Sequence, residues 1–111
     1  MQYLLLIYEN EKRFSQGFDP AEMGEYQAFG KQFSTNIKGS NALQPTGTAK
    51  SVRVRNGKAA TTDGPFAETK EQLGGYYLVE ASSVDEAAKM AAKIPGARFG
   101  TVEVRPIMTF S

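Results

Sequence analysis

The sequence contains no cysteine, no histidine and no tryptophan among its 111 residues. The missing cysteine and histidine exclude a thiol nucleophile, a disulfide, an imidazole base and a zinc site of the usual kind. A metal would need a site made of oxygen ligands alone, and we expect neither a metal nor a cofactor. Any acid–base chemistry is therefore left to Asp, Glu, Lys and Tyr side chains.

The sequence also lacks a charge excess and a long hydrophobic run. Thirteen Lys and Arg residues face 12 Asp and Glu residues, and this balance argues against an electrostatic nucleic-acid binder. The longest apolar run, Tyr3 to Tyr8, has six residues, whereas a membrane span needs roughly 20. No basic residue flanks this run, as one would in a signal peptide. We expect a cytoplasmic protein with one domain, residues 1–111, and no membrane contact.

The first half of the sequence predicts a strand and a helix. The continuously apolar Tyr3 to Tyr8 indicates a strand that is buried on both faces. Asp19 as N-cap, Pro20 at the first helical position and Glu22 closing a capping box predict a helix start. The helical stripe of this segment consists of Met23, Tyr26, Phe33 and Ile37, and Lys38-Gly39 supplies its stop. We interpret residues 40–48 as a loop.

The second half predicts a hairpin, a strand, a helix and a last strand. Asn56-Gly57 is the strongest short hairpin signal, and it joins strands 51–55 and 58–62. Residues 76–81 form a further strand. Ser83 and Glu86 open a second capping box, whose helix ends at Pro95-Gly96. Thr101 to Arg105 alternates as a last strand.

This order of elements matches an α+β fold, the ferredoxin-like split βαβ arrangement, with two helices on one face of an antiparallel sheet. In that fold the valines are expected to point to the helices, while the charged residues between them occupy the open face. The valines are Val52, Val54, Val102 and Val104, and the charged residues are Arg53, Arg55, Glu103 and Arg105. Because the open face also carries Tyr and Leu, we expect a second copy of the chain to cover it in a homodimer.

The segment TDGPFAETKE, residues 62–71, closely resembles the signature of the YCII-related superfamily, in the branch named for its DGPFAETKE motif. Residues 1–8, 52–58, 71–78 and 102–106 are similar to the flanking strands of that branch, in the same order. The resemblance implies a dimeric α+β barrel. It also implies an association with an extracytoplasmic-function sigma factor, which is a further candidate partner.

Asp63 is the candidate for chemistry that the resemblance singles out. In the superfamily, a His and the Asp of the DGP motif are suggested as an acid–base pair beside a cleft, and Asp63 matches that Asp while this chain has no His. The residues themselves also favour a plain turn, because Asp-Gly-Pro is turn chemistry. We predict that the Asp63 carboxylate accepts hydrogen bonds from backbone N–H groups of residues 64–68 and lies within reach of a Lys or Arg.

The remaining site candidates surround this motif. The ligand-binding candidates are Arg53, Arg55, Asp63, Gly64, Pro65, Phe66, Tyr76 and Arg105. Phe66 is expected to plug the core beneath the loop. Arg53 and Arg55 are either a solvated edge that resists sheet pairing or, with Arg105, an anion site in the dimer cleft.

Three functions remain open on this basis. The first is binding of a small molecule in a cleft beside the Asp63 loop, which we rank above the others. The second is an enzyme that uses Asp63 for acid–base chemistry, which would require burial to raise its pKa. The third is a regulatory or interaction module that acts with a sigma factor.

Overall fold

The computed structural model describes residues 1–110. The strands are Gln2–Glu9 (β1), Ile37–Ala42 (β2), Lys50–Arg55 (β3), Lys58–Asp63 (β4), Gln72–Glu80 (β5) and Thr101–Pro106 (β6). The helices are Pro20–Gln32 (α1) and Val84–Ala91 (α2), and short 3-10 helices occupy Glu11–Phe14 (η1), Thr46–Thr48 (η2) and Pro95–Arg98 (η3).

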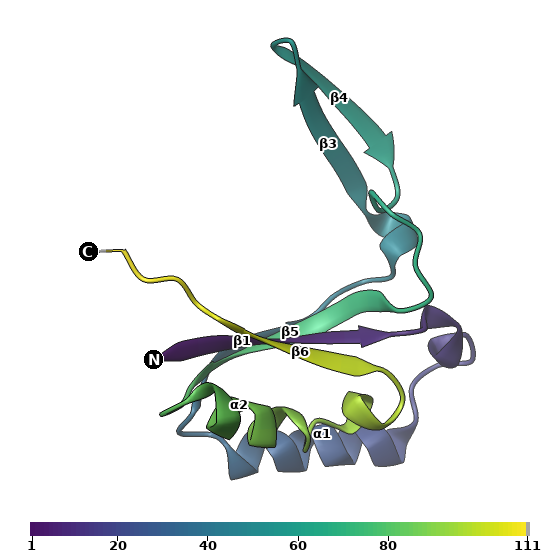
Figure 1. The fold of residues 1–111 in the computed structure, drawn as a ribbon. Helices are drawn as coiled ribbons and strands as arrows, with labels where there is room; N and C mark the ends of the chain where they lie inside the picture. Colours follow the sequence, from purple (N-terminus) through teal and green to yellow (C-terminus); the bar gives the residue numbers. More distant parts are fainter. Residues whose placement is uncertain (111) are drawn as a thin grey trace.

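Four of the strands form an antiparallel sheet in the order β2-β5-β1-β6. Both helices lie against one face of this sheet, and its other face is open (Figure 1). Without β3 and β4, the chain runs strand, helix, strand, strand, helix, strand, which is the ferredoxin-like connectivity. The α+β class and the two helices on one face are therefore as predicted.

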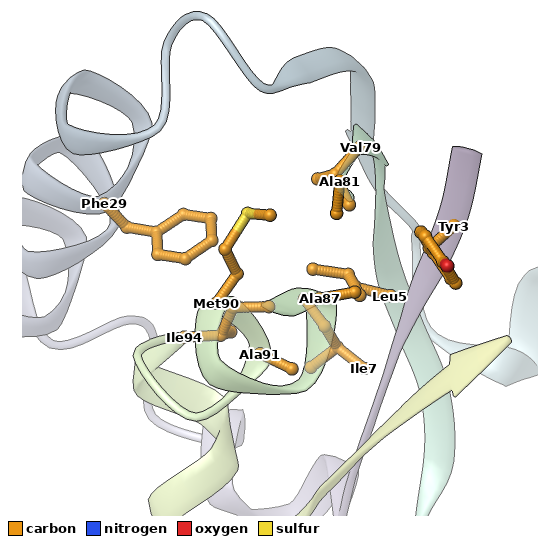
Figure 2. Close-up of a cluster of buried hydrophobic side chains, with 10 residues drawn as sticks. All are labelled: Tyr3, Leu5, Ile7, Phe29, Val79, Ala81, Ala87, Met90, Ala91 and Ile94. Carbon is orange, nitrogen blue, oxygen red and sulfur yellow. The ribbon is translucent and has the colours of Figure 1, made fainter. Parts of the chain in front are cut away.

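The hydrophobic core lies between the helices and the central strands (Figure 2). The strands and the residue after β5 contribute Tyr3, Leu5, Ile7, Val79 and Ala81, and the helical side contributes Phe29, Ala87, Met90, Ala91 and Ile94. Helix α2 contributes Ala87, Met90 and Ala91 to this core, but it ends at Ala91 instead of continuing to Pro95-Gly96 as expected. Ser83 caps α2 by accepting a hydrogen bond from the Glu86 N–H at 3.1 Å.

Strand β1 is buried on one face instead of two, contrary to the expectation from its apolar run. Its residues alternate between half-buried and buried, so that Tyr3, Leu5 and Ile7 face the helices. Leu4 and Leu6 face the open side of the sheet, where their partners in β5 are Leu78 and Tyr76. The open face is therefore apolar along its centre, as the sequence predicted.

The expected continuation of the first helix to Ile37, followed by a loop over residues 40–48, is wrong. Helix α1 ends at Gln32, and Ile37–Ala42 forms the edge strand β2 beside β5. Only one edge of this strand is paired, so its exposed and polar sequence lacks the apolar alternation that marks a half-buried strand. Asp19 caps α1 as predicted, because its carboxylate accepts a hydrogen bond from the Ala21 N–H, but Glu22 does not close a capping box and contacts Arg13 instead.

The β3–β4 hairpin is a separate two-stranded sheet that projects away from the open-face side of the main sheet (Figure 1). Its turn is the predicted one, because Asn56 and Gly57 both have the positive φ that this tight turn requires. Val52 and Val54 were expected to face the helices, yet 63% and 58% of their surfaces are exposed. Because paired residues share a face, these valines form one side of the hairpin with Ala59 and Thr61.

Among residues 1–110, no helix is both long enough and apolar enough to cross a membrane.

We predict that Gly100→Ala destabilises the fold, because a Cβ at this position would overlap the carbonyl oxygen of Tyr8. Overpacking of this kind costs about 1–3 kcal/mol of unfolding free energy. Gly24→Ala is the matched control. Its Cβ would meet no atom within 4 Å in the middle of α1, and alanine there should add about 0.5–1 kcal/mol. Urea denaturation followed by circular dichroism measures both, and equal stabilities for the two variants would contradict the prediction.

Candidate functional site

A large cavity lies between α1, η1 and the β5–β2 edge of the sheet, and we call it the α1 cavity. Its volume is about 860 Å³. Most of its wall is apolar or aromatic, with Ile7, Phe14, Phe18, Met23, Leu43 and Tyr77 among the lining residues. Buried or half-buried Glu9, Glu22 and Tyr26 lie on the same wall. The cavity is thus a mainly apolar space with a few polar groups, which is the usual composition of a small-molecule site.

Two buried carboxylates of this wall share one guanidinium group. Arg13 donates from the same nitrogen, Nη2, to Glu9 Oε2 at 3.1 Å and to the two oxygens of Glu22 at 2.7 and 3.0 Å. The side chains of Glu9 and Glu22 are each 8% exposed, and that of Arg13 is 27% exposed. Glu9 ends β1, Arg13 lies in η1 and Glu22 lies in the first turns of α1, so this Arg13 cluster joins three elements.

Aromatic rings enclose the guanidinium group of Arg13. Its central carbon lies 3.9 Å from the ring centre of Phe99 and 4.6 Å from that of Phe14. These distances are within the range of a cation–π interaction, which favours a charged guanidinium in a partly dry environment. The rings therefore restrict Arg13 to the position in which it meets both carboxylates.

Gly96 lets the η3 segment approach the Arg13 cluster closely. Its N–H donates a hydrogen bond to the Tyr26 hydroxyl oxygen at 3.2 Å, and a Cβ at this position would overlap Glu9 Oε1. Oε1 of Glu9 is buried and has no hydrogen-bond partner among residues 1–110. The cluster therefore contains an acceptor with unused capacity next to a cavity, which is uncommon for a buried carboxylate.

Burial changes the acidity of two groups on this wall. Loss of solvation raises the pKa of the Glu9 carboxyl above its usual range, although the hydrogen bond and the charge of Arg13 act in the opposite direction. Burial, followed by the negative charge of Glu9, raises the pKa of Tyr26 to about 12. Tyr26 is therefore protonated at neutral pH, and Glu9 takes up a proton more readily than an ordinary carboxyl group does.

This arrangement supports hydrogen bonding to a ligand and proton exchange with it. Glu9 accepts when ionised and donates when protonated, and an apolar cavity beside it is the environment that acid–base chemistry needs. In the part of the chain that the structure describes, no group of three or more Asp or Glu side chains is arranged to hold a metal ion.

Asp63 lies far from such an environment. Its side chain is 85% exposed, and its carboxylate accepts a hydrogen bond from Lys50 Nζ at 2.5 Å. The predicted bonds from backbone N–H groups after the turn are not formed by the described residues, whereas the predicted cation is present as Lys50. Gly64 has a φ of +91°, and its N–H donates to the Ala49 carbonyl oxygen at 2.7 Å, so the turn is held by backbone bonds.

The other predicted site residues are dispersed in the single chain. Phe66 is 81% exposed, so it does not plug the core as expected. Arg53 and Arg55 project from the hairpin on the face opposite the valines, whereas Arg105 lies on β6 and pairs with Glu103 at 2.5 Å. Tyr76 is the one predicted residue on the wall of the α1 cavity, and its hydroxyl accepts a hydrogen bond from Asn41 at 2.8 Å.

Glu9, Arg13 and Glu22 were not among the site residues expected from the sequence. A signal for Glu9 was present, because it continues the alternation of Tyr3, Leu5 and Ile7 and so occupies a buried position of β1. A carboxylate at a position expected to be buried calls for a partner. The partner itself, Arg13, sits four residues later in a segment that showed no periodicity.

The whole chain matches one known family. The YCII-related domain matches residues 1–111. An uncharacterized protein of Rhizobium meliloti (strain 1021) is 34% identical over 117 residues, which cover 99% of this chain and 94% of that protein. Among solved structures, a similar one is 5-chloro-2-hydroxyhydroquinone dehydrochlorinase from Burkholderia phenoliruptrix AC1100 in complex with 2,5-dihydroxybenzoquinone. It has a TM-score of 0.58 and 15% identity, and the match covers 97% of this chain and 94% of that one.

We predict that Arg13→Met destabilises the protein strongly, because Glu9 and Glu22 would remain buried without a cation. Removing one partner of a buried ion pair costs about 3–5 kcal/mol, and the partial exposure of Arg13 favours the lower end of this range. Arg98→Met is the control, because its pair with Glu25 is formed by half-exposed side chains and should change stability little. Thermal unfolding measures both, and a larger effect at Arg98 would refute the role of the cluster.

Proposed function

This chain belongs to the YCII-related domain family, and we propose that it binds a small organic molecule in the α1 cavity. The observation that carries the proposal is the juxtaposition of an apolar space of about 860 Å³ with the unpaired oxygen of the buried Glu9. A buried acceptor without a partner costs stability, and a ligand that donates a hydrogen bond would offset that cost.

The shape of the cavity supports this function. Its wall combines the aromatic rings of Phe14, Phe18, Tyr26 and Tyr77 with few polar groups, so a flat organic molecule would bury most of its surface there. The similar dehydrochlorinase fold was solved with a bound dihydroxybenzoquinone, so a fold of this type accommodates a single-ring ligand. The proposal for this chain rests on its own cavity.

The proposed binding site differs from the one expected from the sequence, which was a cleft beside the Asp63 loop. The α1 cavity is favoured over that loop because Asp63 is exposed and paired with Lys50, whereas Glu9 is buried and lines the cavity. An enzyme remains the second candidate, and the raised pKa of Glu9 favours Glu9 over Asp63 for a proton-transfer role. A regulatory module acting with a sigma factor stays a prediction from the resemblance alone.

We also propose that the chain acts as a homodimer. Two apolar surfaces support this proposal, namely the Leu4 and Leu6 side of the main sheet and the Val52 and Val54 side of the hairpin. A two-stranded hairpin alone is marginal in water, and within residues 1–110 this one pairs with no other strand. A second copy would cover both surfaces and close the sheet face as the resemblance implies.

We predict that single-ring aromatic fragments bind the protein and that Met23→Trp weakens their binding at least about tenfold. Met23 lines the cavity and is 53% exposed, so an indole there would occupy ligand space without disturbing the core. Met108→Trp is the matched control, because it is the same change at an exposed methionine outside the cavity. Saturation-transfer NMR with an aromatic fragment set measures the binding. Absence of any fragment that is sensitive to Met23→Trp would refute the proposed function.

We predict that light scattering gives about twice the chain mass of 12.1 kDa. The double variant Val52→Asp and Val54→Asp should shift the mass toward that of one chain, since charges would enter the apolar side of the hairpin. Arg53→Ser, on the opposite side of the same strand, should leave the mass unchanged. A wild-type protein with the mass of a single chain at micromolar concentration would contradict the dimer.

A further inference from the structure

The α1 cavity carries more negative than positive charge. Glu9, Glu11, Asp19 and Glu22 line it, and within residues 1–110 Lys12 is the one cation on its wall. Arg13 neutralises part of this charge from behind the wall, but the carboxylates still outnumber the cations. A cavity of this charge repels an anionic ligand and attracts a cationic one.

Two carboxylates of the cavity wall, those of Glu11 and Asp19, accept hydrogen bonds from uncharged groups. Glu11 accepts hydrogen bonds from the Thr46 N–H at 2.7 Å and from its hydroxyl at 3.0 Å. Asp19 accepts from the Ala21 N–H at 3.0 Å as the N-cap of α1. Neither forms an ion pair with a described cation, so no described ion pair offsets their negative charge on the cavity wall.

Glu22 and Glu9, the two buried carboxylates of the cavity wall, differ in how many of their oxygens accept a hydrogen bond. Both oxygens of Glu22 are occupied by Arg13, whereas Oε1 of Glu9 accepts no hydrogen bond from residues 1–110. Glu9 is 6% exposed, so water supplies little compensation. Oε1 lies against Gly96, so a ligand amine would reach it by rotation of the Glu9 side chain and would then form a charge-assisted hydrogen bond.

The rest of the wall suits the body of such a ligand. The rings of Phe18, Tyr26 and Tyr77 line the same space, and aromatic faces attract organic cations. The rings of Phe14 and Phe99 already hold Arg13, which illustrates the same preference in this region.

We propose that the ligand of the α1 cavity is an organic cation, with a protonated amine that binds Glu9 and a single aromatic ring that lies among the aromatic side chains. This inference rests on the proposed function and narrows it to one charge class. Ligands with a carboxylate or phosphate in place of the amine are disfavoured, because the carboxylates on the wall outnumber Lys12, its one cation within residues 1–110.

The test uses three probes that share a phenyl ring and differ in charge. These are 2-phenylethylammonium, 2-phenylethanol and 3-phenylpropanoate, each titrated into the wild-type protein by calorimetry at low salt. We expect the cation to bind at least about tenfold more tightly than the alcohol, and the anion to show no binding. Binding of the cation should weaken as salt is added.

Two variants assign the effect to the cavity. Glu9→Gln preserves the shape of the side chain and should weaken binding of the cation about tenfold, whereas Glu25→Gln, on the far side of α1, should leave it unchanged. Asp19→Asn keeps the helix cap, because Asn is an equally good N-cap. This variant should weaken binding of the cation a few fold. Asp19→Asn provides the charge test if Glu9→Gln does not fold, which thermal unfolding reports.

The outcomes separate this inference from the proposed function. The inference is supported if the cation binds more tightly than the alcohol and the anion, and if Glu9→Gln or Asp19→Asn weakens binding of the cation. Equal binding of the alcohol, tighter binding of the anion, or no binding of the cation overturns the inference, and the proposed function survives if Met23→Trp still weakens some other fragment. A cation affinity that neither acidic variant changes also overturns it.

Discussion

The placement of helix α1 depends on one half-buried guanidinium group, that of Arg13. Arg13 satisfies two carboxylates that come from β1 and α1, and the rings of Phe14 and Phe99 hold it between them. A buried ion pair of this kind adds little net stability compared with apolar packing, but it is costly to break. Its contribution is therefore positional, because it determines where the N-terminal half of α1 lies relative to the end of β1.

The cavity follows from the two different ways in which α1 is attached. Its C-terminal half packs directly on the sheet, where the ring centre of Phe29 lies 4.9 Å from that of Tyr77. Its N-terminal half is held by long polar side chains instead, through the Arg13 cluster and the Tyr26 contact to Gly96. Polar contacts at the ends of long side chains leave space between the backbones, and this space is the α1 cavity.

The most conspicuous motif of the sequence and the most site-like region of the structure do not coincide. The DGPF segment forms the exit of an exposed hairpin, where Asp63 pairs with Lys50 in solvent. The cavity is instead lined mainly by residues of the first half of the chain, together with residues of β5, and Asp63 is not among them. A motif identifies a family here, while burial and unpaired polar atoms identify the candidate site.

The sequence by itself determined the features that depend on a few neighbouring residues. Asp19 and Ser83 cap their helices, Asn56-Gly57 turns the hairpin, and the order of helices and strands gives the fold class, because each signal acts through local backbone geometry. The tertiary structure alone decided that β2 pairs with β5, that the hairpin leaves the main sheet, and that Arg13 meets Glu9 and Glu22. These outcomes depend on which distant residues become neighbours, and the burial that raises the pKa of Glu9 exists only after the chain has packed.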